Sequence, residues 1–182
     1  MFPCMSFARP RKTGSEDELY EYAVGALARR MRSVAELKRL LRQRVEAGTE
    51  YGKTLVELVI RRLKDQGYLN DAKYAATYSF FRRENEKFGR MRVITDLRAK
   101  GVHSEVIAKA VASAYDEVNE EKQARDYLRR KRLKKPKDRK QAARIFRQLV
   151  RAGFGSKTIF AILKKWDVDD EALGALPAEE GP

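Results

Sequence analysis

Residues 97–111 read LRAKGVHSEVIAKAV, the pattern of two helices joined by a short corner. Gly101 follows a run of helix-forming residues and can adopt the left-handed conformation that often ends a helix. Ser104 is then expected to cap a second helix, in which Ile107 and Val111 fall on one face. The stretch therefore predicts a helix, a corner at the glycine, and another helix.

The same corner recurs after 52 residues, where residues 149–163 read LVRAGFGSKTIFAIL, with Gly153 and Ser156 in the places of Gly101 and Ser104. The alignment needs no gap, and one more step towards the N-terminus also aligns apolar residues. The aligned columns are Val45, Leu97 and Leu149; Leu55, Ile107 and Ile159; and Val59, Val111 and Leu163. Recurrence of apolar positions at one period indicates a repeat protein.

Helix-capping signals divide each repeat into about three helices. The expected capping residues, besides Ser104, are Ser15, Ser33, Asn70, Asn119 and Asp138. We therefore expect an all-α fold, a tandem repeat of three three-helix units at residues 16–69, 70–118 and 119–166, forming an elongated, curved molecule. Residues 1–15 are expected to be a disordered basic tail and residues 167–182 a disordered acidic tail.

The charge of the chain indicates a polyanionic partner. The formal net charge is +14, from 40 basic and 26 acidic residues. Such an excess favours nucleic acid over the alternatives, a solubilising surface or membrane headgroups. Residues 119–168 hold 17 Lys/Arg and five Asp/Glu, whereas residues 70–118 hold nine and seven. The third unit, the most basic, is therefore the strongest candidate for phosphate contact.

Two patterns select the residues that are expected to bind nucleic acid or a filament. Residues 129–135 carry six bases and no acid, a crowding that is self-repulsive unless an anion relieves it, although a solvated helix face is the alternative. Arg30, Arg82 and Lys134 hold the same repeat position in the three units and could form a row. The predicted binding residues are Arg30, Arg82, Arg83, Arg129, Arg130, Lys131, Arg132, Lys134 and Lys135.

Two further features have competing interpretations. Tyr74, Tyr78 and Phe81 lie at helical spacing and form either a base-stacking platform or part of the core, and the spacing favours the core. Residues 167–182 contain six acids and no base. They either fold back on the basic surface as a mimic of nucleic acid or simply solubilise the protein, and the second account is favoured.

The sequence lacks the residues that common catalytic and metal sites need. His103 is the only histidine and Cys4 the only cysteine, so neither a zinc cluster of the usual kind nor an internal disulfide is expected. No glycine-rich phosphate-binding motif and no apolar run long enough for a membrane span occurs. We expect a cytoplasmic protein that acts by binding, not an enzyme, with no cofactor and no metal.

A set of short motifs resembles the RecX regulatory proteins of bacteria. The resemblance covers about residues 18–166 and is strongest through the middle unit. It is carried by Asp65-Gln66-Gly67-Tyr68-Leu69-Asn70-Asp71, Tyr74-Ala75, Arg82, Phe88-Gly89, Ile94, Leu97-Arg98-Ala99-Lys100-Gly101-Val102 and Ile107. That family is built of tandem three-helix repeats, in agreement with the period of 52 residues in this chain.

The resemblance implies a modulator, usually an inhibitor, of the RecA recombinase in DNA repair and the SOS response. Such proteins bind the RecA filament on single-stranded DNA and interfere with filament growth, ATP hydrolysis, strand exchange and co-protease action. The implied partners are the RecA filament, single-stranded DNA and also double-stranded DNA, with no membrane, and we expect a monomer. The alternatives are a DNA-binding transcription regulator, because the glycine corners resemble those of a helix-turn-helix, and a generic protein-binding scaffold.

Overall fold

The computed structural model describes residues 12–166, which form nine α-helices and contain no β-strand. The helices are α1 (Glu16–Arg29), α2 (Val34–Arg42), α3 (Glu50–Asp65), α4 (Asp71–Glu84), α5 (Arg90–Ala99), α6 (Ser104–Ala114), α7 (Glu120–Arg130), α8 (Arg139–Arg151) and α9 (Ser156–Lys164). The all-α prediction is confirmed, and nine helices agree with three repeats of three. Residues 1–11 and 167–182, which hold most of the two predicted tails, lie outside the described residues.

The helices pack into two compact units. Unit 1 comprises residues 12–74 together with Lys100–Val102, and unit 2 comprises Ala75–Ala99 and residues 103–166. Helix α4 therefore begins in unit 1 and continues into unit 2. The boundaries of the three sequence repeats and the elongated, curved shape stay predictions.

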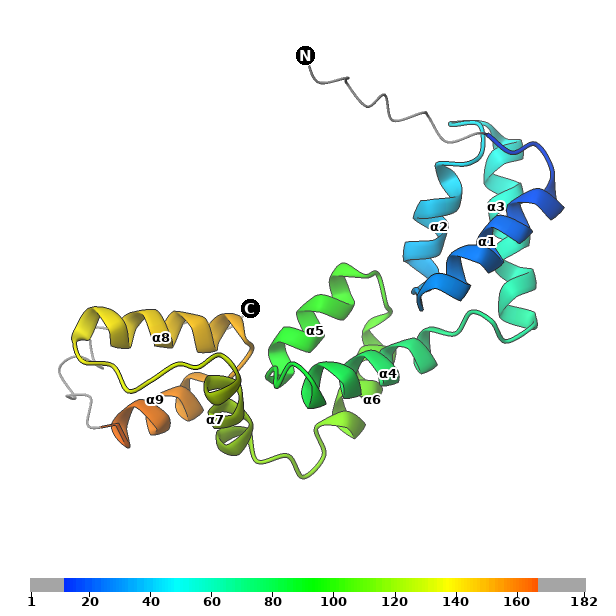
Figure 1. Ribbon diagram of the computed structural model, residues 1–182. Helices are drawn as coiled ribbons and strands as arrows, with labels where there is room; N and C mark the ends of the chain where they lie inside the picture. Colours follow the sequence, from blue (N-terminus) through cyan, green and yellow to red (C-terminus); the bar gives the residue numbers. More distant parts are fainter. Residues whose placement is uncertain (1–11, 167–182) are drawn as a thin grey trace, which may run out of the picture. The chain divides into compact units, whose positions relative to one another are not determined.

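The core of unit 1 is built by the first three helices, which lie at the blue and cyan end of the chain in Figure 1. Helices α1 and α2 both pack against α3 and against each other. Leu37 and Leu41 lie one helical turn apart on α2, as do Val59 and Leu63 on α3, and all four side chains are fully buried. The helical spacing of apolar residues in the sequence therefore produces this core.

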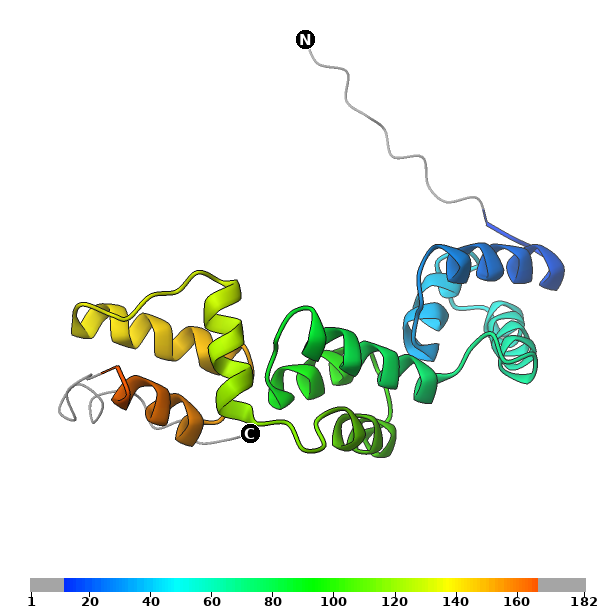
Figure 2. The same ribbon diagram turned by 60° about the horizontal axis from the view of Figure 1, so that its bottom comes forward.

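One hydrophobic core of unit 2 lies between its last three helices, α7, α8 and α9. Helices α7 and α8 each pack against α9, as Figure 1 and Figure 2 both show. The ring of Phe146 on α8 is buried and its centroid lies 5.4 Å from that of Phe160 on α9. Tyr127 of α7 joins the core, with its ring centroid 5.8 Å from that of Phe154. This packing fixes which faces of α7 and α8 are left to solvent.

Most of the predicted helix caps are present. Ser33 forms a full capping box: its Oγ accepts from the Glu36 N–H over 3.1 Å, and the Glu36 carboxylate accepts from the Ser33 N–H over 3.2 Å. The other side chains that accept a capping hydrogen bond as predicted are Ser15, Asn70, Asn119 and Asp138. The prediction for Ser104 is wrong, because His103 is the N-cap residue of α6 and Ser104 is its first helical residue.

The two glycine corners have the predicted conformation. Gly101 has φ +72° and Gly153 has φ +88°, and the Ile107 and Val111 side chains after the first corner are buried as expected. Corners of this kind need glycine, because other residues are strained at positive φ.

Each corner also packs on the start of an earlier helix, a contact that the repeat pattern did not reveal. In unit 1 the Ser33 Oγ donates to the Lys100 carbonyl over 2.6 Å at the start of α2. In unit 2 the Gly89 N–H donates to the equivalent carbonyl, that of Ala152, over 2.8 Å at the start of α5. A Cβ on Gly101 would lie 2.5 Å from the Ala35 Cβ, so the corner has no space for a side chain. Each corner therefore joins two helices that are far apart in the sequence within one unit.

Candidate nucleic-acid interface

The chain leaves α7 through a helix end that is fixed by backbone hydrogen bonds. The Leu133 N–H donates to the Leu128 carbonyl over 2.9 Å, and the Arg132 N–H donates to the Arg129 carbonyl over 3.0 Å. These two bonds form a Schellman motif, in which Arg132 takes the left-handed position with φ +54°. Leu133 packs against the core of unit 2, and Pro136 is buried. The loop is therefore anchored by apolar residues while its cations face solvent.

We call residues 129–135 the loop patch. All six of its cations, the predicted residues Arg129, Arg130, Lys131, Arg132, Lys134 and Lys135, are exposed. Arg129 pairs with Asp126 over 3.2 Å, and Arg130 pairs with Glu86 over 3.2 Å. The Arg129 side chain is 81% exposed, so solvent screens its ion pair and an approaching anion can displace the acid.

Helix α8 carries a second set of cations that the sequence reasoning missed. Its buried residues lie on one face, and the basic residues Lys140, Arg144, Arg147 and Arg151 lie opposite. At 3.6 residues per turn these four fall within an arc of about 60°. All four are exposed, and α8 contains no acidic residue. We call these four residues the α8 stripe.

Acidic side chains are missing from the neighbourhood of the stripe in the sequence as well. Residues 139–166, which cover α8 and α9, contain eight Lys/Arg and no Asp or Glu. Within residues 12–166, none of the four stripe residues forms an ion pair. The nearest preceding acid, Asp138, is used as the N-cap of α8. The stripe therefore has no compensating charge from the described chain.

Arg82 and Arg83, also predicted to bind, lie in internal networks of unit 2. The Arg82 Nε donates to the Tyr78 hydroxyl over 2.9 Å, and its Nη2 lies 3.8 Å from a carboxylate oxygen of Asp96. Arg83 donates to the Ala114 carbonyl and pairs with Glu84 at 2.8 Å. Both side chains are less than a third exposed. Their internal contacts stabilise the unit, and a binding role for them stays a prediction.

The predicted row of one base per repeat places its members in different surroundings. Arg30 is exposed at the end of α1, and Lys134 is exposed in the loop patch. Arg82 is partly buried, with its guanidinium also stacked 5.5 Å from the centre of the Phe88 ring. Residues at the same position of the repeat therefore differ in their exposure to solvent. That Arg30, Arg82 and Lys134 form one binding row stays a prediction.

The aromatic residues of α4 divide between core and surface. Tyr74 is buried, and Tyr78 is half-buried with its hydroxyl donating to Asp96 over 3.0 Å. Burial raises the pKa of Tyr78 above its usual value. Phe81 is 53% exposed, so the expectation that all three aromatics belong to a buried stripe is wrong for Phe81. Seven residues bring Phe81 back to the same side of α4 as Tyr74, so helix periodicity alone does not account for its exposure; its neighbour Phe80 is exposed as well.

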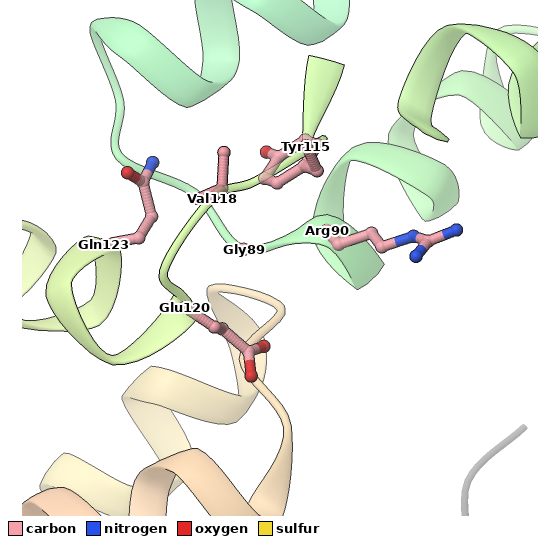
Figure 3. A pocket seen from close by; sticks show the side chains of 6 residues that line it. All are labelled: Gly89, Arg90, Tyr115, Val118, Glu120 and Gln123. Atoms are coloured by element: carbon pink, nitrogen blue, oxygen red, sulfur yellow. The ribbon is translucent and has the colours of Figure 1, made fainter. Parts of the chain in front are cut away.

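A pocket beside Gly89 in unit 2 is lined by residues whose hydrogen bonds stabilise the fold. Its volume is about 260 Å³, and Figure 3 shows its lining residues. The Tyr115 hydroxyl donates to the Phe88 carbonyl over 2.8 Å, and burial raises the pKa of that phenol. The Glu120 carboxylate accepts from the Gly155 N–H over 3.0 Å and so caps α9. This cap ties the start of α7 to the start of α9.

The described residues offer no other chemistry of a familiar kind. Among residues 12–166, no group of His, Cys, Asp or Glu side chains is placed to hold a metal ion. No helix in this part of the chain is long and apolar enough to cross a membrane. The fold and surface thus define a class, the helical-repeat binding proteins with a strongly basic face.

Comparison with known proteins identifies the family. Residues 70–111 match the family described as RecX, second three-helix domain. The chain is 37% identical over 169 residues to Regulatory protein RecX of Myxococcus xanthus, covering 86% of this chain and 87% of that protein. It is 33% identical over 165 residues to Regulatory protein RecX of Deinococcus radiodurans, covering 86% of this chain and 74% of that protein. The chain belongs to the RecX family of regulatory proteins, which modulate RecA and are not enzymes.

Solved structures agree on the fold. A crystal structure of regulatory protein RecX matches with a TM-score of 0.62 and 23% identity over 82% of this chain and 71% of that chain. The crystal structure of RecX from Lactobacillus salivarius matches with a TM-score of 0.61 and 19% identity over 84% of this chain and 96% of that chain. At these identities the likeness concerns the fold alone.

Proposed function

We propose that this chain binds the RecA filament on single-stranded DNA and slows its ATP hydrolysis, strand exchange and co-protease action, and so modulates DNA repair. The observation that carries the DNA part is the α8 stripe beside the loop patch, a basic surface with no acid on its helix. Membership of the RecX family supports the RecA part. In this proposal the protein acts as a monomer in the cytoplasm, and double-stranded DNA uses the same surface.

The geometry of the stripe suits the DNA backbone. Residues 140–151 span about 16 Å along the helix at 1.5 Å per residue. Phosphates of one stacked strand follow each other at about 3.4 Å, so the stripe faces about five of them. The stripe consists only of Lys and Arg, which contact phosphates without reading the sequence. We therefore expect binding that depends on salt and not on base sequence.

The packing of the corners argues against a helix-turn-helix transcription regulator. That class presents its second helix to the major groove of DNA from a free corner. Here the Gly153 corner is occupied, because its carbonyl accepts from the Met91 N–H over 3.2 Å and a Cβ on Gly153 would overlap the Arg92 backbone. The corner serves packing within unit 2.

The proposal is tested by adding the protein to RecA on single-stranded DNA and following ATP hydrolysis. Wild-type protein should slow hydrolysis, and the variant R144E/R147E should need about ten times more protein for the same effect. The control R39E/R61E changes the charge equally at exposed positions of α2 and α3 in unit 1, and it should behave as wild type. Undiminished hydrolysis with equimolar wild-type protein would contradict the RecA part.

Salt dependence of binding to a single-stranded oligonucleotide tests the phosphate contacts directly. The four stripe contacts alone predict a slope of log K against log salt of about −2.8, to which contacts of the loop patch add, and losing two stripe contacts should make the slope shallower by about 1.4. The first slope corresponds to an affinity loss of about 50-fold between 50 and 200 mM salt. A slope near zero for wild-type protein would exclude a phosphate-led contact.

A further inference from the structure

We propose that the acidic segment that follows α9, residues 167–180, occupies the α8 stripe when DNA is absent and competes with DNA for it. This inference rests on the proposed function, because DNA is the ligand with which the segment competes. Support for the surface comes from the described residues of α8, and support for the segment comes from its amino-acid sequence.

The surface lacks a counter-charge of its own. The four stripe cations lie in line on one exposed face, and α8 and α9 together hold no acid. Two acids pair with the loop patch, Asp126 with Arg129 and Glu86 with Arg130, and neither forms an ion pair with a stripe residue. Four neighbouring cations repel each other unless an anion approaches. An anionic occupant therefore lowers the free energy of this surface.

The first acids along the chain after α8 are those of the segment. Residues 167–180 read DVDDEALGALPAEE and contain six acids and no base. Four of the acids fall within residues 167–171, directly after the described residues. The segment thus matches the stripe in charge, with carboxylates in place of phosphates.

The segment is also long enough to reach the whole stripe. Helix α9 ends beside the start of α8, at the same end of this helix pair in Figure 1 and Figure 2. Trp166 and Ala143 accordingly pack against the same core. Fourteen residues can extend over about 46 Å, whereas the thirteen residues of α8 span about 20 Å. Tethering gives such a segment an effective concentration in the millimolar range.

The effect on DNA binding follows from this tethering. With an effective concentration of about 1 mM and a segment affinity of about 0.1 mM, only about one stripe in ten is open to DNA. Neutralising the six acids, in D167N/D169N/D170N/E171Q/E179Q/E180Q, should therefore strengthen binding of a single-stranded oligonucleotide about tenfold at low salt. The gain should shrink as salt is added, because the segment is then displaced from wild-type protein as well.

A charge-matched control separates local competition from net charge. It converts six exposed acids without a described ion pair to amides, namely Glu21, Glu46, Asp65, Glu105, Asp116 and Glu117. The control should change the affinity by less than about threefold, because screening limits the reach of distant charges to about 10 Å. Equal affinities of wild type and the segment variant, or an equal gain in the control, would overturn the proposal.

A spin label locates the segment directly. In full-length protein with C4S, a nitroxide on A178C should weaken the amide signals of the far half of the stripe, at Arg147 and Arg151. The signals should recover when a single-stranded oligonucleotide is added, and in R144E/R147E. Undisturbed α8 signals, or weakening that DNA does not reverse, would overturn the proposal. Failure of wild type and variants alike to bind DNA would instead overturn the proposed function.

Discussion

The substitution Arg132→Gly tests how the loop patch is held, and it should make the protein more stable while weakening its binding. Arg132 has φ +54° at the left-handed position of the α7 Schellman motif. Glycine fills the left-handed position after α3, α5 and α8, as Gly67, Gly101 and Gly153. A non-glycine residue in this conformation costs roughly 1–2 kcal/mol, and the greater freedom of glycine in the unfolded chain returns about 0.5–1 kcal/mol of that. We therefore expect a net gain of about 0.5–1 kcal/mol.

Urea unfolding followed by far-UV circular dichroism measures this gain. Urea is preferable to guanidinium, whose ions screen the repulsion among the patch cations. Two controls separate conformation from charge. Lys134→Gly removes a cation at an exposed loop position that has no positive φ, and it should not stabilise the protein. Arg132→Lys keeps the cation and the strain, and its stability should equal that of wild type.

Binding to single-stranded DNA should change in the opposite direction. Loss of one phosphate contact lowers the salt slope by about 0.7, equivalent to about fivefold in affinity at 0.1 M salt. Both Arg132→Gly and Lys134→Gly should show this loss, whereas Arg132→Lys should not. The reasoning is refuted if Arg132→Gly is less stable than wild type, or if Lys134→Gly gains as much stability.

Two further substitutions test the joints at the corners. Gly153→Ala should lower the free energy of unfolding by roughly 2–4 kcal/mol, because its Cβ would overlap the Arg92 backbone. The control Gly48→Ala, at φ +81° with open space around it, should cost only about 1–2 kcal/mol of strain. Equal losses of stability in urea unfolding would contradict the close packing at Gly153. Burial opposes ionisation of Glu36, but hydrogen bonds from Lys100 and the Ser33 N–H hold its pKa below the usual value. The contribution of Glu36 to the free energy of unfolding is therefore complete above about pH 4.5 and disappears as the pH falls through the lowered pKa. Glu36→Gln should therefore lower the free energy of unfolding by about 1–3 kcal/mol at pH 7 and make stability depend less on pH at the acid end. The control Glu57→Gln, at an exposed pair with Lys38, should cost about 0.5 kcal/mol or less. An unchanged dependence of stability on acid pH in Glu36→Gln would contradict the stabilising role of the Glu36 carboxylate.

The sequence was sufficient for the fold wherever a local pattern determines the conformation. Apolar columns at one period predicted buried residues such as Leu97 and Leu149, and the turn chemistry predicted positive φ at Gly101 and Gly153. The Ser104 cap was wrong because the residue before it, His103, already has the extended conformation of an N-cap without a side-chain hydrogen bond. Capping preferences locate the start of a helix to within about one residue, and the backbone conformation of the corner determines which residue is the N-cap.

The candidate site shows where sequence reasoning stopped. Selection by density found residues 129–135 but not the α8 stripe, although the spacing 140, 144, 147 and 151 was visible as one helical face. A search for cations opposite an apolar face, rather than for runs of cations, would have found it. The partners of Arg82 could not be predicted in the same way, because Phe88 and Asp96 reach it only through packing of α4 with the following segment.

The arginines of unit 2 therefore divide by what surrounds them, and this division assigns their roles better than their number does. Arg82 and Arg83 are partly buried, and each has acceptors within the unit, so removing either leaves polar groups without partners and costs stability. Arg144 and Arg147 are exposed and have no acidic partner among the described residues, so the fold gains nothing from their charge. A charge that does not stabilise the fold and repels its neighbours is retained at a cost in stability. In the two proposals made above, the anion that offsets this cost is the DNA of the filament or the acidic segment of the same chain.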